Sequence, residues 1–340
     1  MIRTPASSPK AQTAYTIVTQ LQDHFVQKLN TLASKDFEAV EWFRDEGLHG
    51  GGLRYESRDD ALFNRASVNI SQVHYDDDEE KKLSSASAIS TIIHPTDPHA
   101  PSMHMHISWT QMREGKGYWR FMADLNPSIE DKDDTKQFFE MFQESIPDYH
   151  DEGVAQGEKY FFIPALERHR GVSHFYLENF HTGDEKADEA LAKHFGESVI
   201  NTYIHILTKH TNQARDISNE EKQQQIEYHT LYFFQVLTLD RGTTSGLLVH
   251  NQNDVGILGS LPQYIHRDLL ESWKPKMPKE QQALLTDILQ ALPETTIVTI
   301  NQEIKKSLSC ALREYYKHSP EALAYQASGD TIPTTVDNHN

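Results

Sequence analysis

Cysteine is nearly absent from this 340-residue chain, which contains only Cys310. A single cysteine excludes an intrachain disulfide and any metal site built from several thiolates. Cys310 lies in a helical pattern, where we expect a small buried side chain. Chemistry that needs several sulfur ligands is therefore excluded.

Long apolar runs are also missing. No run approaches the roughly 18 to 20 apolar residues of a membrane-spanning helix. Residues 1–13 lack the apolar core of a secretory signal peptide. We therefore expect a cytoplasmic protein without a membrane span.

Basic residues are few relative to acidic ones. The chain has 32 Lys and Arg against 50 Asp and Glu, which gives a formal net charge of −18. This balance argues against nucleic acid or an anionic membrane surface as a partner. If the substrate is an anion, a local cluster of arginines or backbone amides must hold it.

Several common enzyme motifs are absent. The sequence has no nucleophile elbow, no Walker loop and no dinucleotide fingerprint. The three glycines at residues 50–52 are not followed by the Lys-Ser/Thr pair of a phosphate-binding loop. A flexible hairpin is the favoured interpretation of these glycines.

Apolar spacing predicts most of the secondary structure. Ile17, Leu21 and Phe25 recur at helical spacing and predict a first helix over residues 13–33. Alternation over residues 63–73 predicts a strand with one solvated face. By the same criteria we expect strands at residues 89–93, 103–110, 118–125, 231–239 and 246–250, and helices at residues 126–146, 184–212, 217–228 and from 262 to 318. Residues 37–44 are expected to form either a strand or a short helix.

The order of these elements favours an α+β fold with an antiparallel sheet, because strands and helices do not alternate regularly. We see no internal repeat and no linker between two cores. We therefore expect one domain over residues 13–320. Residues 1–12 and 329–340 lack periodicity and are expected to be disordered tails.

Titratable residues gather between residues 89 and 127. His94, His99, His104 and His106 are followed by Asp124 after a predicted hairpin. Since side chains alternate along a strand, His104 and His106 point to the same face. Together with Asp124 they could ligate iron, zinc or manganese. A hydrogen-bonded polar surface is the more common outcome, and both interpretations stay open.

Two further groups are candidates for binding an anion. Asp240 and Arg241 follow an apolar run, where Arg241 could hold a carboxylate and Asp240 could accept a proton, although a simple turn is equally consistent with the residues. Arg168, His169 and Arg170 form either an anion clamp or an exposed basic loop.

The motifs, taken in order, resemble the oxygen-dependent coproporphyrinogen III oxidases of haem biosynthesis. The similarity extends over about residues 40–265. The segments that carry it are the glycines at 50–52, residues 63–71, His94-Pro95 through His104, Ala123-Asp124-Leu125-Asn126-Pro127, residues 160–162 through Arg170-Gly171, Asp240-Arg241-Gly242-Thr243 and Ser260-Leu261-Pro262.

The resemblance implies a large antiparallel sheet flanked by helices on both faces, in a homodimer. It also implies oxidative decarboxylation of coproporphyrinogen III to protoporphyrinogen IX, with dioxygen as oxidant and no required cofactor. The implied catalytic residues are His104, Asp124, Asp240 and Arg241. The implied substrate-binding residues are Ser90, Asn69, His106, Ser108 and Arg170. His94 and His104 match histidines that are sometimes assigned to a divalent metal.

Some positions depart from the family pattern. Ser108 stands where the family has an arginine that binds a propionate, and a glycine-rich turn is shortened to residues 121–123. Other departures are at Gln137, at Ala165 and at residues 250–252. Arg120, Arg168 and His106 are the candidates to compensate. Two alternatives follow: a tetrapyrrole-binding paralogue without turnover, and a metal-dependent oxygenase that uses His104, His106 and Asp124.

Overall fold

The computed structural model describes residues 1–340 except 58, 116, 333–335 and 337–340. A seven-stranded sheet lies at its centre, and every neighbouring pair of strands in it is antiparallel. The α+β class with a large antiparallel sheet is confirmed. In spatial order the strands are β1 (Glu38–Phe43), β2 (Gly50–Glu56), β3 (Phe63–His74), β4 (Leu83–Pro95), β5 (Ser102–Met112), β6 (Tyr118–Asn126) and β9 (Ser173–Phe180).

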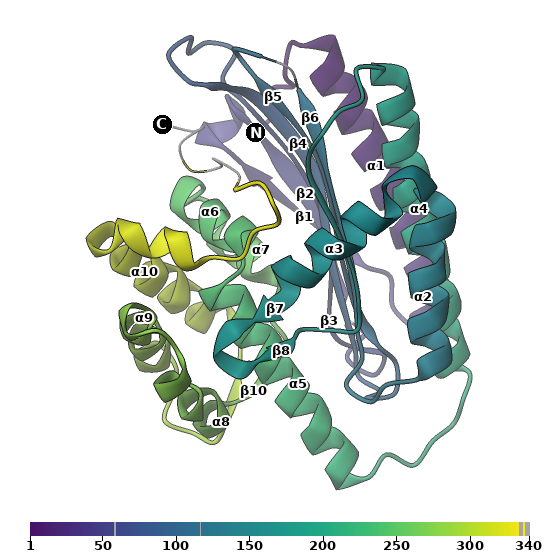
Figure 1. The fold of residues 1–340 in the computed structure, drawn as a ribbon, viewed down its shortest axis with the longest axis vertical. Helices are drawn as coiled ribbons and strands as arrows, with labels where there is room; N and C mark the ends of the chain where they lie inside the picture. Colours follow the sequence, from purple (N-terminus) through teal and green to yellow (C-terminus); the bar gives the residue numbers. More distant parts are fainter. Residues whose placement is uncertain (58, 116, 333–335, 337–340) are drawn as a thin grey trace.

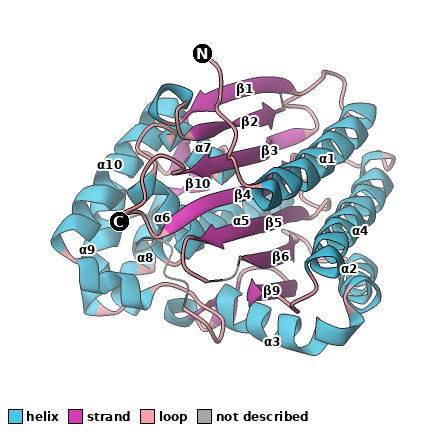
Figure 2. Cartoon of the chain, turned by 90° about the horizontal axis from the view of Figure 1, so that it is seen from above, coloured by secondary structure: helices cyan, strands magenta, loops and turns pink. Residues whose placement is uncertain are grey.

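Helices cover both faces of this sheet (Figure 1). On one side lie α1 (Pro9–Leu32), α2 (Lys132–Ser145) and α4 (Glu185–Thr211). Strand residues Val68, Ile89, Met105 and Ile107 pack with these helices in one apolar core. The helix α3 (His150–Phe161) runs alongside the edge strand β9 (Figure 2).

A second apolar core lies on the other side of the sheet. Among the described residues, Ile92 is the contribution of the large sheet to this core. Many other side chains on this face are polar, among them Ser67, Asn69, His104 and Ser108. The elements here are α5 (Asn219–Thr238), α6 (Arg241–Val249), α7 (Asp254–Ile257), α8 (Arg267–Ser272), α9 (Lys279–Gln290), α10 (Gln302–His318) and the short pairs β7 (Phe162–Ile163) with β8 (Arg168–His169) and β10 (Tyr264–His266) with β11 (Ile297–Thr299).

Side-chain alternation along the strands produces this contrast between the two faces. On β5, Met103, Met105 and Ile107 are fully buried in the first core. His104 and His106 lie between them and face the polar side. The prediction that these two histidines share one face is confirmed.

The prediction of a strand at residues 231–239 is wrong, because these residues form the C-terminal part of α5. Nearly every side chain there is buried, including Leu231, Phe233 and Leu237. A helix buried on all sides has no amphipathic period, so its sequence resembles that of a buried strand. The return strand expected at residues 246–250 is likewise part of the helical segment α6.

Residues close to the N-terminus make specific contacts with the sheet. The buried Ala6 donates its backbone N–H to Gln72 Oε1 at 2.9 Å. Ser8 then caps α1, which begins at Pro9 rather than at residue 13. Cys310 is also placed differently than expected, since it is exposed on α10. The helix around it is amphipathic, and Cys310 lies on the outer face.

The C-terminal tail prediction is only partly covered by the structure. Asp330 forms an ion pair with Lys159 of α3, so the beginning of this segment is attached. Residues 333–335 and 337–340 lie outside the described residues. In the part of the chain that is described, no helix has the length and apolar character needed to cross a membrane.

Candidate functional site

A cavity of about 270 Å³ lies between the polar face of the sheet and the helices α5 to α7. This volume lies just below the range of about 300 to 1,000 Å³ for small-molecule pockets. The sheet contributes His104, His106 and Arg120 to its wall, among other polar side chains. The helical side contributes Asp240 and Tyr232. Residues far apart in the sequence therefore face one space.

Strand register places the predicted binding residues side by side. Asn69 pairs with Ser90, and Ser90 pairs with His106, so the three form one row across β3, β4 and β5. In the next row, two residues further along the strands, Ser108 pairs with Arg120 of β6. All five side chains line the cavity. Residues opposite one another in antiparallel strands share a face, which explains the grouping.

His104 is held by the carboxylate of Asp124, its partner across β5 and β6. His104 Nδ1 lies 2.8 Å from Asp124 Oδ1. On the other carboxylate oxygen, Arg170 Nη2 and Asn126 Nδ2 each donate at 2.6 Å. Burial opposes ionisation of Asp124, but Arg170 and His104 outweigh it and hold the pKa of this carboxyl well below its usual range.

The tautomer of His104 follows from this arrangement. An ionised carboxylate can only accept, so Nδ1 of His104 carries the proton that it donates to Asp124. The other ring nitrogen, Nε2, is then available to accept or transfer a proton in the cavity that His104 lines. Asp124 itself is fully buried and is not among the described residues that line the cavity.

Arg170 lines the cavity, but its guanidinium is bonded to partners within the protein. Besides its bond to Asp124, Arg170 Nη1 donates to Gln235 Oε1 at 2.6 Å. The guanidinium lies 4.6 Å from the ring centre of Phe161 and 4.7 Å from that of Tyr232. Arg168 is exposed. An anion clamp made jointly by Arg168 and Arg170 is therefore not formed.

Asp240 and Arg241 point in different directions. Asp240 lines the cavity and caps α6, with Thr243 N donating to Oδ1 at 2.6 Å and Tyr160 Oη donating to Oδ2 at 3.1 Å. Arg241 donates instead to backbone carbonyls of Leu323, Gln326 and Ala327. Arg241 is not among the described lining residues. The structure therefore does not bring this predicted pair together at the cavity.

Arg120 supplies a guanidinium beside Ser108. Its Nε and Nη2 both donate to the carboxylate of Glu178 on β9. Tyr176 also donates to Glu178. Residues 121–123 continue β6 without a turn, so the expected shortened turn is wrong. Tyr176 and Glu178 were missed in the sequence, although the alternation over residues 173–180 places both on the polar face.

His94 lies away from the cavity wall. Its Nδ1 is 2.8 Å from Ser102 Oγ and its Nε2 is 3.1 Å from the carbonyl oxygen of Ser260. Burial lowers the pKa of His94 well below its usual value, with His229 and Arg170 acting in the same direction. Both ring nitrogens are engaged, so a metal shared by His94 and His104 is not favoured.

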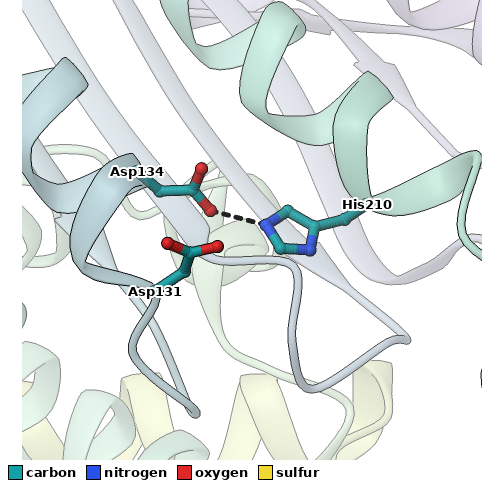
Figure 3. A group of neighbouring side chains, drawn as sticks. All are labelled: Asp131, Asp134 and His210. Atoms are coloured by element: carbon teal, nitrogen blue, oxygen red, sulfur yellow. Dashed lines mark hydrogen bonds and ion pairs between the residues drawn. The ribbon is translucent and has the colours of Figure 1, made fainter.

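One group in the described chain has three metal-type ligand atoms within 4.8 Å of one another: Asp131, Asp134 and His210 (Figure 3). The ammonium of Lys209 lies 2.6 Å from Asp131 Oδ2 and 2.8 Å from Asp134 Oδ1. His210 Nδ1 accepts from Arg215 at 3.1 Å. These cations balance the carboxylates, and the group acts as an ion-pair network between α2 and α4.

The proposed metal set of His104, His106 and Asp124 is not assembled. Both oxygens of Asp124 are used by His104, Asn126 and Arg170. Breaking these bonds would leave Arg170 buried without its anion. A metal-dependent oxygenase at this position is therefore not favoured.

Comparison with known proteins gives a consistent result. Residues 13–292 match the family described as coproporphyrinogen III oxidase. The chain is 28% identical over 279 residues to the oxygen-dependent coproporphyrinogen-III oxidase, mitochondrial, of Rattus norvegicus, a match that covers 73% of this chain and 61% of the rat protein. The chain therefore spans less than two thirds of the length of this mitochondrial relative.

Two other relatives are covered over more of their length. The oxygen-dependent coproporphyrinogen-III oxidase of Drosophila melanogaster is 26% identical over 294 residues, with 77% of this chain and 74% of the fly protein covered. The oxygen-dependent coproporphyrinogen-III oxidase of a Prochlorococcus marinus strain is 26% identical over 331 residues, with 83% of this chain and 92% of the bacterial protein covered.

Proposed function

Because this chain belongs to the coproporphyrinogen III oxidase family, we propose that it catalyses the oxygen-dependent oxidative decarboxylation of coproporphyrinogen III. Each of two propionates loses CO₂, a proton and two electrons and becomes a vinyl group. Dioxygen accepts the four electrons with four protons and leaves as two water molecules. The observation that carries the proposal is the cavity, which gathers His104, Asp240 and a row of hydrogen-bonding side chains opposite an apolar helix.

Asp240 is the proposed partner of the pyrrole N–H groups. Its two oxygens already accept from Thr243 and Tyr160, but each carboxylate oxygen has a further lone pair. Burial raises the pKa of Tyr160 well above its usual value, with Asp240 contributing, so this hydroxyl stays a donor. The carboxylate is thereby fixed in position while it faces the substrate.

His104 is the proposed group for proton transfer. Its Nδ1 is bonded to Asp124, and Nε2 remains for the substrate. Asp124 acts as a positioning residue, because it orients the ring without lining the cavity. Removal of a positioned acid–base group typically lowers a rate by about 10²- to 10⁴-fold.

Reduced coproporphyrinogen III, incubated with pure protein in air and under anaerobic conditions, tests the proposal. Products are followed by chromatography with fluorescence detection. We expect decarboxylation in air alone, a kcat about 10²- to 10⁴-fold lower for His104→Gln, and a reduced rate for Asp240→Asn, which retains a good helix cap. The exposed Arg168→Gln variant is the matched control and should retain the wild-type rate.

Failure of the wild type to release CO₂ in air would disprove catalysis. Tight binding without turnover would favour the paralogue alternative. Loss of activity on chelation would favour the metal-dependent one.

We also propose that residues 13–320 form one domain, that the protein is a homodimer and that it is located in the cytoplasm. Support for one domain comes from the two apolar cores, which pack on opposite faces of one sheet. The dimer rests on the family resemblance, and light scattering of the purified chain would measure it. Dioxygen is the proposed co-substrate.

A further inference from the structure

We propose that Arg120, Ser108 and His106 form a subsite that binds one carboxylate of the substrate, with Arg120 Nη1 as its anchor. The inference rests on the proposed function, since it assumes that a carboxylate-bearing tetrapyrrole enters this cavity. It assigns the anion-holding role to β5 and β6 rather than to the start of α6.

The three side chains meet because of strand pairing. Ser108 and Arg120 are direct partners across β5 and β6, and His106 precedes Ser108 by two residues on the same face. All three line the cavity. A carboxylate placed over this corner of the sheet would lie within reach of all of them.

One nitrogen of the Arg120 guanidinium is not bonded to another described residue. Its Nε and Nη2 are bonded to Glu178, whereas Nη1 has no hydrogen-bond partner within the described residues. The two bonds to Glu178 fix the plane of the guanidinium before a ligand arrives. Preorganised guanidinium donors bind carboxylates with defined geometry at a low entropic cost.

His106 adds a second unsatisfied group. Its Nε2 is buried and has no hydrogen-bond partner among the described residues. Buried polar nitrogens are usually bonded, so an unpaired nitrogen on a residue that lines the cavity is a candidate contact for a ligand. Burial lowers the pKa of His106 well below its usual value, helped by Arg120 and His104, so the ring is neutral and can donate one N–H.

The other arginines near the site are less suited to this role. Arg170 is almost fully buried, and both of its terminal nitrogens are bonded to Asp124 and Gln235. Arg241 is bonded to the carbonyls of the C-terminal segment. The Arg120 side chain keeps 14% of its surface exposed. Arg120 is therefore the guanidinium that can meet a ligand without losing its structural partner.

The test compares the double variant Arg120→Gln with Glu178→Gln against the wild type. Changing both residues removes the guanidinium without leaving Glu178 as an unpaired buried charge. Dissociation constants are measured by fluorescence quenching with coproporphyrin III and with its tetramethyl ester. KM and kcat are measured separately with coproporphyrinogen III.

We expect the double variant to bind the acid about 10- to 100-fold more weakly than the wild type, because one charge-assisted interaction is lost. Affinity for the ester should be unchanged. KM for coproporphyrinogen III should rise in parallel with little change in kcat, since the anchor contributes uniform binding. Ser108→Ala with His106→Asn keeps the Arg120–Glu178 pair and should weaken acid binding by a smaller factor. Arg168→Gln should match the wild type.

Unchanged acid affinity in both multiple variants, with a wild type that binds the porphyrin, overturns the subsite and leaves the proposed function intact. Equal weakening for acid and ester would also overturn it, because a general loss of packing would then be the cause. A wild type that binds neither porphyrin and does not turn over coproporphyrinogen III overturns the proposed function and the subsite together.

Discussion

Asp124 shows how a fully buried charge can be stabilised by its neighbours. Its carboxylate accepts from His104, Asn126 and Arg170, which come from β5, β6 and the segment before β9. These bonds hold the carboxyl pKa below its usual range although burial acts against them. A group whose pKa is lower in the folded than in the unfolded state stabilises the fold above the unfolded pKa of about 3.9.

Asp124→Asn should therefore destabilise the protein at neutral pH. The variant leaves Arg170 buried without its anion, and we expect the free energy of unfolding to fall by about 3 to 5 kcal/mol. Urea unfolding at pH 7 measures this change. The difference in the free energy of unfolding between the wild type and the variant should shrink as the pH falls from about 4 through the lowered pKa of Asp124. The exposed Asp133→Asn is the control and should change little. A variant as stable as the wild type would contradict the role of this bond network.

The two charged residues at the start of helix α6 have different structural roles. Asp240 caps the helix and faces the cavity, whereas Arg241 binds the carbonyls of Leu323, Gln326 and Ala327. Gln326 in turn donates to Tyr316 Oη at 3.1 Å and to Thr244 Oγ1. In this arrangement, Arg241 attaches the segment after α10 to the helical layer.

Arg241→Ala should loosen that segment and leave substrate binding nearly unchanged. We expect amide hydrogens of residues 319–330 to exchange faster, because the bonds that hold their carbonyls are lost. KM for coproporphyrinogen III should change by less than about threefold, since a side chain outside the cavity contributes little to binding. Arg168→Ala provides a control with an exposed arginine. A KM raised more than about tenfold, with exchange unchanged, would instead support direct binding of a propionate.

The sequence predicts best those elements in which apolar residues recur with a clear period. Residues 63–73 and 103–110 alternate because each strand has an apolar and a polar face, and both predictions agree with β3 and β5. Residues 231–239 gave the wrong answer because Leu231, Phe233 and Leu237 are buried in a helix without a polar side. Residues 1–12 carry no period, yet tertiary contacts such as Ala6 with Gln72 hold them in place.

At the scale of the whole molecule, the site depends on strand register, which periodicity alone does not determine. His104 and Asp124 were predicted together, and the pairing of β5 with β6 joins them. Glu178 could not be assigned to Arg120 from sequence, because 58 residues separate them along the chain. The sequence predicted Arg241 beside Asp240 at the cavity, whereas its side chain points to the C-terminal segment. That direction depends on contacts with residues 82 or more positions away in the chain, which the local sequence does not show.

Lys305 is a buried lysine of the helical layer that interacts electrostatically with charged residues of the sheet. It lies on α10 with 3% of its surface exposed. Burial lowers its pKa to about 7, with Arg65 and Arg54 acting in the same direction and Glu56 opposing them. In the unfolded chain the pKa of a lysine is about 10.4. Between these two values the unfolded state binds more protons than the folded state, so the stability must rise with pH.

Lys305→Met should remove this dependence on pH and stabilise the protein. In the wild type, Lys305 adds a slope of up to about 1.4 kcal/mol per pH unit between pH 7 and 10. The variant should lack this contribution and be more stable at pH 6, on the order of 1 to 4 kcal/mol, because an apolar side chain replaces a buried charge. Denaturant unfolding across this pH range measures both effects. Lys306→Met, at an exposed neighbouring position, should keep the wild-type slope. Equal slopes in the wild type and in Lys305→Met would contradict a buried, largely neutral lysine between the two layers.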